Sequence, residues 1–212
     1  MSLSLKNIEL RLRGMVPSPL RKLYRISRSM GTGKPSKSLP PQLVQNCTFC
    51  ASRLHMLDFL PREAIVAELG TYKGDFARHI LSKTNPKELH LIDLDYSKFN
   101  DAHLSVPSVH RHRGLVHEVI STFEDEYFDW VYVDADHSFE GVSRDARASA
   151  DKVKPGGFMV FNDFAHIDPS LGRYGVHRAV VDFALENGWQ FRFFAFQSNA
   201  LYDVALQKPQ VN

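Results

Sequence analysis

Acidic and amide side chains recur at four points where an apolar run of the sequence ends. The four endings are Glu68-Leu-Gly70, Asp93-Leu-Asp95, Asp134-Ala-Asp136-His137 and Asn162-Asp163. A structural role alone would accept almost any residue at such positions. If the runs are neighbouring strands of one parallel sheet, their carboxyl ends meet at one edge, which is where ligands bind in open α/β sheets. The sequence therefore predicts a polar binding edge.

Asp134, Asn162 and Asp163 are the candidate metal ligands at this edge. We expect Asp134 and Asp163 to end two adjacent strands, which lie about 4.8 Å apart in a sheet. Two carboxylates and an amide oxygen at that spacing suit a hard divalent cation such as Mg²⁺. Without a cation the two carboxylates repel each other and at least one pKa rises. The alternative is that both aspartates only cap the helices that follow.

His137 follows Asp134 by three residues and is the candidate general base. Imidazole titrates near neutral pH, so it can accept a proton from a hydroxyl group. A metal ion beside it would lower the pKa of that hydroxyl. The alternative is an ordinary loop histidine bonded to a neighbouring acid. Asp136, an acid in the same turn, is expected only to orient His137.

Residues 68–74 (ELGTYKG) lie between a predicted strand and a predicted helix, where nucleotide-binding loops occur. The segment lacks both G-x-G-x-x-G and the Gly-Lys-Ser/Thr of a P-loop. Gly70 and Gly74 still allow a ligand to approach the backbone closely, and the N–H groups of the next helix can bind a carboxylate. Asp93 ends the next strand, where it can accept both hydroxyls of a ribose. The alternative is a generic turn with a capping acid.

Apolar runs alternate with helical patterns from residue 64 onward. We expect strands at residues 64–69, 89–94, 109–112, 130–133, 158–161, 190–196 and 201–206, the last two antiparallel, and helices at 76–81, 115–123, 139–153 and 176–186. Residues 154–157 (KPGG) indicate a stop between a helix and a strand. This alternation predicts an α/β fold with a doubly wound, seven-stranded, mostly parallel sheet of the Rossmann-like type.

Residues 1–45 are expected to form a basic N-terminal extension with helical structure and a linker, and residues 46–212 the cofactor-binding domain. Residues 1–40 carry nine Lys/Arg and one acidic residue, whereas the remainder has a net charge of −6. The extension contains a single aromatic residue, Tyr24. Proteins that bind nucleic acid usually interleave aromatic and basic residues. We therefore expect the extension to pack on the acidic body or on a second subunit.

The composition excludes several classes of protein. With 43% hydrophobic and 24% charged residues, the chain is neither disordered nor a disulfide scaffold. It has no apolar run long enough to cross a bilayer and no secretory signal, and its two cysteines fit a reducing compartment. We expect a cytoplasmic protein. Cys47 and Cys50 lack the second pair of ligands that a zinc site needs, so both are predicted to be structural.

Several segments together resemble class I S-adenosylmethionine-dependent methyltransferases. Residues 66–74 (VAELGTYKG) are similar to the first motif of that family, and residues 91–93 (LID) to the second. Residues 132–141 (YVDADHSFEG), 153–157 (VKPGG), 160–163 (VFND) and 175–180 (GVHRAV) are similar to the small-molecule O-methyltransferase branch, which includes macrolide-sugar and cephalosporin-pathway enzymes. The resemblance spans residues 64–206.

The resemblance implies S-adenosylmethionine as cofactor and a site for each part of it. The residues implied in binding are Glu68, Gly70, Thr71, Tyr72, Gly74 and Phe76 around the methionine portion, Asp93 and Leu94 at the ribose, Gly114 and Leu115 near the adenine, and Asp134. It also implies that Asp134 and His137 act in catalysis. The metal implied is Mg²⁺ on Asp134, Asn162 and Asp163.

The activity implied is magnesium-assisted transfer of a methyl group to a hydroxyl of a small molecule, either a sugar or another natural product. We expect a homo-oligomer with no membrane partner and no nucleic acid. Three alternatives stay open. They are a metal-independent N-methyltransferase, a non-catalytic cofactor-binding interaction protein whose basic arm docks on nucleic acid, and a nicotinamide dehydrogenase, which the missing G-x-G-x-x-G disfavours.

Overall fold

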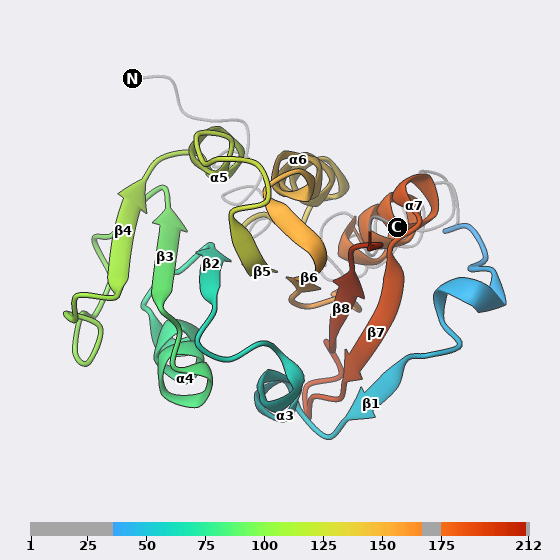
Figure 1. The fold of residues 1–212 in the computed structure, drawn as a ribbon, viewed down its shortest axis with the longest axis horizontal. Helices are drawn as coiled ribbons and strands as arrows, with labels where there is room; N and C mark the ends of the chain where they lie inside the picture. Colours follow the sequence, from blue (N-terminus) through green and yellow to red (C-terminus); the bar gives the residue numbers. More distant parts are fainter. Residues whose placement is uncertain (1–35, 167–174, 211–212) are drawn as a thin grey trace, which may run out of the picture. The chain divides into compact units, whose positions relative to one another are not determined.

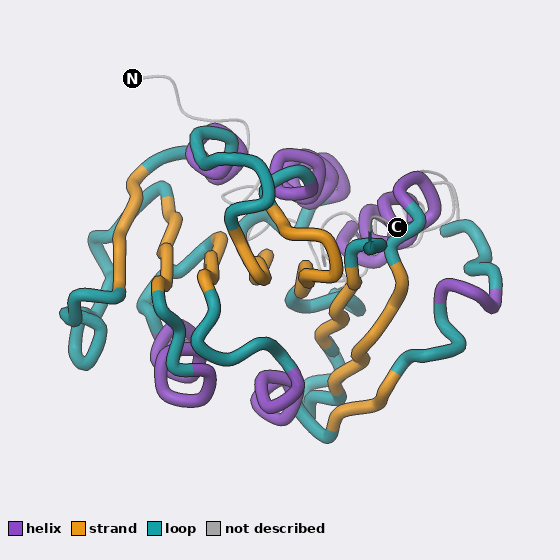
Figure 2. The backbone as a smooth tube through the Cα atoms, in the orientation of Figure 1, coloured by secondary structure: helices purple, strands orange, loops and turns teal. Residues whose placement is uncertain are grey.

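An eight-stranded mixed sheet runs through the part of the chain that the computed structural model describes, residues 36–166 and 175–210 (Figure 1, Figure 2). The strand order is β1-β7-β8-β6-β5-β2-β3-β4. β8 is antiparallel to its neighbours β6 and β7, and every other pair is parallel. The predicted α/β class, the mostly parallel sheet and the final antiparallel pair are confirmed.

The predicted strands and helices all have counterparts. The strands are β1 (Thr48–Cys50), β2 (Ile65–Leu69), β3 (Glu88–Asp93), β4 (Val109–Arg113), β5 (Phe128–Val133), β6 (Val153–Phe161), β7 (Gln190–Ala195) and β8 (Asp203–Gln207). The helices are α3 (Arg53–Met56), α4 (Asp75–Thr84), α5 (Val116–Ile120), α6 (Phe139–Ala150) and α7 (Gly175–Asn187), with 3₁₀ turns η1 (Pro41–Leu43) and η2 (Leu57–Phe59).

Two sequence-based expectations are wrong. The sheet has eight strands rather than seven, because the three residues of β1 pair in parallel with β7 at the edge of the sheet. So short a strand has no alternation long enough to recognise in the sequence. Residues 154–157 do not separate a helix from a strand either. α6 ends at Ala150, and β6 already begins at Val153, with a register irregularity opposite Phe128 and Trp130 that accommodates the Pro-Gly-Gly segment.

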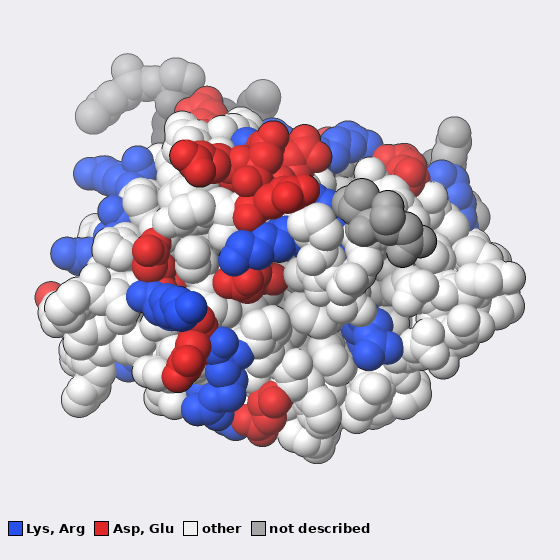
Figure 3. Space-filling view, viewed as in Figure 1, with Lys and Arg blue, Asp and Glu red and all other residues white. Residues whose placement is uncertain are grey.

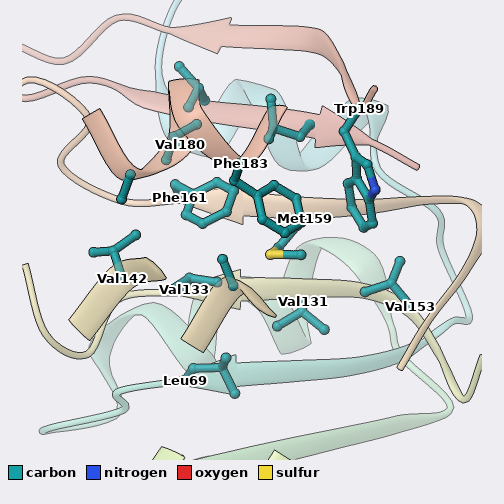
Figure 4. Close-up of a cluster of buried hydrophobic side chains, with 14 of the residues drawn as sticks. Leu69, Val131, Val133, Val142, Val153, Met159, Phe161, Val180, Phe183 and Trp189 are labelled. Carbon is teal, nitrogen blue, oxygen red and sulfur yellow. The ribbon is translucent and has the colours of Figure 1, made fainter. Parts of the chain in front are cut away.

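Alternate residues of the central strands pack into two hydrophobic layers, one on each face of the sheet. Val131 and Val133 of β5 belong to the layer under α5, α6 and α7, and Trp130 and Tyr132 belong to the layer under α3 and α4. Figure 4 shows part of the first layer, where side chains of α7 meet Met159 and Phe161 of β6. Burial on both faces explains why these strands are continuous apolar runs.

Most of the predicted basic extension lies in residues 1–35, outside the described residues, so its structure and the predicted domain boundary stay predictions.

Acidic side chains gather on the viewed face over α5 and α6 (Figure 3). None of the described helices combines the length and the apolar character that crossing a membrane requires.

Candidate active site

The carboxyl ends of β2, β3, β5 and β6 lie at one edge of the sheet, because these four strands are parallel and β5–β2–β3 and β5–β6 are neighbours. The residues brought to this edge are Glu68, Asp93, Asp134, Asn162 and Asp163. Val133 pairs with Phe161, so the polar residues that follow β5 and β6 leave the sheet side by side. The predicted adjacency of these two strands is confirmed.

Gly70 begins the loop between β2 and α4, and only glycine fits there. Its φ is +89°, and a Cβ atom added to it would lie 2.3 Å from the backbone oxygen of Asp134. Gly74 ends the loop with φ +79°, and its added Cβ would lie 2.7 Å from Leu104. The Gly70–Gly74 loop therefore lies directly against the end of β5 and keeps its backbone accessible at the start of α4.

Asp93 is held by two backbone N–H groups at the end of β3. Tyr72 N–H donates to Oδ2 at 2.7 Å, and Asp95 N–H donates to Oδ1 at 2.9 Å. Leu94, the residue after β3, is 60% exposed, and Leu115, the second residue after β4, is 43% exposed. A fixed carboxylate at a strand end, followed by an exposed apolar side chain, can bind the hydroxyls of a sugar next to a flat ring.

Glu68 lies at the bottom of the same edge and is 1% exposed. Burial, together with the nearby Asp134 carboxylate, raises the pKa of Glu68 well above its ordinary value. Within the described residues, Glu68 Oε2 and Thr71 Oγ1 are buried polar atoms without a hydrogen-bond partner. Such atoms are rare in folded proteins and indicate a missing partner.

Oxygen atoms of the three predicted metal ligands all lie close to one nitrogen of His137. Its Nε2 atom lies 3.4 Å from Asp134 Oδ1, 3.5 Å from Asn162 Oδ1 and 3.6 Å from Asp163 Oδ2. The hydrogen bond with Asp134 raises the pKa of His137, although burial opposes the shift. Burial also raises the pKa of Asp134, and the His137 contact opposes that rise. The contact between the two side chains therefore favours the protonated form of His137.

Three other polar residues of this region, Asp136, His166 and Arg178, each contact a different group. Asp136 accepts a hydrogen bond from the backbone N–H of Ser138 at 2.9 Å. Within the described part of the chain, no hydrogen bond or ion pair joins Asp136 to His137. His166 lies beside the site, with its ring 5.2 Å from the His137 ring. Arg178 instead stacks over Phe139 at 4.1 Å, on the α6–α7 side.

A buried polar network beneath the site was not predicted. Tyr132 donates its hydroxyl to Asp203 Oδ2 at 2.7 Å, and Asn162 Nδ2 donates to Tyr132 and Asp203 at 3.0 and 3.2 Å. Gln197 also donates to Asp203. Burial raises the pKa of Asp203 to about 7. Asn162 is thus fixed with its amide oxygen toward His137, a role that only the pairing of β8 with β6 reveals.

Residues 67–164 match the family model of a methyltransferase domain. The match to a methyltransferase domain supports an S-adenosylmethionine-dependent methyltransferase. The matched segment runs from the third residue of β2 to just beyond β6, and it includes the glycine loop, Asp93, Asp134, His137 and the Asn162-Asp163 pair. Comparison with curated proteins gives no match.

Solved methyltransferases share this fold at low sequence identity. An O-methyltransferase family protein from Burkholderia thailandensis has a TM-score of 0.56 at 14% identity, over 75% of this chain and 56% of that one. The N-methyltransferase NodS from Bradyrhizobium japonicum WM9 has a TM-score of 0.56 at 16% identity, over 74% and 93%. An S-adenosylmethionine-dependent methyltransferase from Methanosarcina mazei has a TM-score of 0.55 at 12% identity, over 74% and 97%. Likeness at this level concerns the fold and does not distinguish oxygen from nitrogen acceptors.

The residues of the methyltransferase fit its cofactor. S-adenosylmethionine carries an ammonium group, for which the buried Glu68 Oε2 is a free acceptor. Gly70 and Gly74 let this loop pack against the Asp134 backbone and the Leu104 side chain, where a Cβ atom would not fit. These features agree with the predicted cofactor edge, although the role of each residue there stays a prediction.

The predicted Mg²⁺ has less support from the structure than the predicted cofactor. The oxygens of Asp134, Asn162 and Asp163 have the right chemistry for Mg²⁺ and converge on one point. That point is His137 Nε2, and no group of three His, Cys, Asp or Glu side chains among residues 36–166 and 175–210 is arranged to hold a metal ion. A protonated His137 supplies a positive charge at the same place.

Proposed function

We propose that this methyltransferase transfers a methyl group to a hydroxyl of a small molecule, a sugar or another natural product. The observation that supports this proposal is the position of His137, whose Nε2 lies 3.4 Å from Asp134 at the edge that carries the glycine loop. A hydroxyl is a weak nucleophile until it loses its proton, so its methylation benefits from a positioned base. A neutral amine acceptor would need such a base less.

The cofactor is assigned to the edge between β5 and β4. Glu68 and the Gly70–Gly74 loop, with Thr71 and Tyr72, surround the methionine portion, and Asp93 binds the ribose hydroxyls. Leu94, Gly114 and Leu115 lie beside the adenine. Phe76 lies in the first turn of α4, and its ring packs on Tyr132 with the ring centroids 4.2 Å apart. The part of Phe76 that contributes to the cofactor site is therefore its backbone N–H.

S-adenosylmethionine supplies an electrophilic methyl group to the acceptor oxygen. Asp134 accepts the Nε2–H of His137 and fixes the tautomer of the ring. Nδ1 of the neutral ring is then the nitrogen that accepts the hydroxyl proton. The resulting imidazolium is stabilised by Asp134 and Asp163, as the raised pKa of His137 indicates. Orientation of the acceptor against the methyl group supplies most of the remaining rate.

The proposal includes a divalent cation held by Asp134, Asn162 and Asp163. A bound Mg²⁺ would lower the pKa of the acceptor hydroxyl. The same three oxygens contact His137 in this structure, so a cation and the Nε2–H group compete for them. A metal-independent reaction is the second candidate, because the Nε2–H group of His137 already faces these three oxygens.

Removal of divalent cations is expected to slow methyl transfer by about 10-fold or more, because the cation activates the hydroxyl. The assay uses S-adenosylmethionine with a panel of sugars and polyhydroxylated natural products, each beside its amine analogue. EDTA is added to one series, and Mg²⁺ is restored to a second. NMR of the product locates the methyl group.

The outcomes separate the parts of the proposal. Methylation of the amine analogues alone contradicts an oxygen acceptor. Oxygen methylation at the same rate with EDTA contradicts the cation and leaves His137 to act as base without it. Asp163→Asn is the matched variant, and it is expected to weaken the response to Mg²⁺ while cofactor affinity is kept.

A further inference from the structure

Arg53 lies at the cofactor edge although it is distant from every motif in the sequence. It begins α3, directly after β1, and its guanidinium carbon lies 4.8 Å from the centre of the Phe76 ring. Phe76 is the second residue of α4, which starts where the Gly70–Gly74 loop ends. The contact with Phe76 therefore places a cation next to the cofactor loop.

Arg53 shares one face of the sheet with Glu68. Glu68 pairs with Tyr132 in the β2–β5 register, so the two side chains project from the same face. The Tyr132 ring contacts Phe76 at 4.2 Å, and Phe76 contacts Arg53. Arg53, Phe76, Tyr132 and Glu68 thus form one continuous layer at the carboxyl end of β2 and β5.

The charge of Arg53 is not neutralised by direct contact. Among the described residues it forms no salt bridge, whereas Arg78, Arg144, Arg147 and Arg178 each have an acid within 4.0 Å. A guanidinium stays charged at every physiological pH.

The layer is complementary to an α-amino acid group. Among the described residues, the buried atoms Glu68 Oε2 and Thr71 Oγ1 have no hydrogen-bond partner. In the same part of the chain, no carboxylate forms a salt bridge with Arg53. We propose that Arg53 binds the α-carboxylate of the cofactor's methionine portion through its guanidinium N–H groups, while Glu68 receives the α-ammonium group. A guanidinium matches a carboxylate with two parallel hydrogen bonds. The assignment rests on the cofactor site described above and adds to it a residue from outside the matched segment.

Two ligands that differ only in the amino acid portion test this assignment. S-adenosylhomocysteine contains the α-carboxylate, and 5′-methylthioadenosine keeps the adenosine and the sulfur but lacks it. In isothermal titrations of the full chain, Arg53→Met is expected to weaken S-adenosylhomocysteine binding by about 10- to 100-fold and 5′-methylthioadenosine binding by less than about twofold. Arg53→Lys is expected to fall between, because it keeps the charge but loses the planar fork.

The control is Arg78→Met, which removes a guanidinium that contacts Asp75 and Asn100 on the exposed side of α4, and is expected to change neither affinity. Thermal unfolding of each variant checks the fold. Equal weakening of both ligands would show that Arg53 only supports the Tyr132 layer and would overturn the proposal, as would unchanged S-adenosylhomocysteine affinity. If S-adenosylhomocysteine fails to bind the unmutated chain, the cofactor site itself is wrong.

Discussion

Replacing His137 with glutamine is expected to lower the rate of methyl transfer by about 10²- to 10⁴-fold and to change the affinity for S-adenosylhomocysteine by less than about twofold. Glutamine can still donate a hydrogen bond to Asp134, but it cannot accept the proton of the acceptor hydroxyl. Steady-state kinetics measure the first quantity, and calorimetric titration measures the second. The separation of the two effects is what distinguishes a base from a residue that shapes the cofactor site.

The matched control is His117→Gln. His117 also lies near a buried acid, with Nδ1 4.0 Å from Asp145 Oδ1, but it belongs to α5. We expect its replacement to leave the rate nearly unchanged. A His137→Gln protein that retains its rate, or that loses cofactor affinity and rate in parallel, would contradict the role of His137 as base.

Replacing Gly70 with alanine is expected to destabilise the protein by about 2–5 kcal/mol and to abolish detectable cofactor binding. Two costs combine at this position. The backbone has φ +89°, which an alanine adopts only with strain, and the added Cβ would lie 2.3 Å from the Asp134 backbone oxygen. Because Asp134 follows β5 directly, any relief of the clash must move the end of that strand or the loop. Urea unfolding measures the stability.

Gly188→Ala separates the two costs. Gly188 has φ +69° but nothing within 4 Å of its added Cβ, so its replacement carries the backbone strain without the clash. It is expected to destabilise by about 1 kcal/mol. If the two variants lose the same stability, the close approach of the loop to β5 does not exist in the protein. The Gly70→Ala protein should also be the one that loses cofactor binding.

Much of the cofactor edge was predictable because its determinants are local. A strand that ends in an acid, followed by a glycine-containing turn, is visible within ten residues, as at Glu68 and Gly70. The parallel arrangement then follows from the alternation of strands and helices, and it brings Asp134 and Asn162-Asp163 together. Oxygens of Asp134, Asn162 and Asp163 lie 3.4–3.6 Å from His137 Nε2, and their role as metal ligands stays a prediction.

The remainder depends on contacts between distant segments. Asp203 reaches Asn162 only because β8 inserts antiparallel between β6 and β7. Arg53 reaches Phe76 only because β1 adds to β7 at the far edge and directs α3 back toward the sheet. Neither a three-residue strand nor a four-residue helix has a recognisable period. Local patterns therefore predict which residues end the strands but not which side chains lie beneath them.

A crystal structure of the protein with S-adenosylhomocysteine tests the central claim most directly, because it locates the ligand without an acceptor. We predict the amino acid portion against the Gly70–Gly74 loop and Glu68, the ribose hydroxyls on the Asp93 carboxylate, and the adenine between Leu94 and Leu115. Ligand density at another place, or a ribose that does not contact Asp93, would contradict the assignment of this edge as the cofactor site.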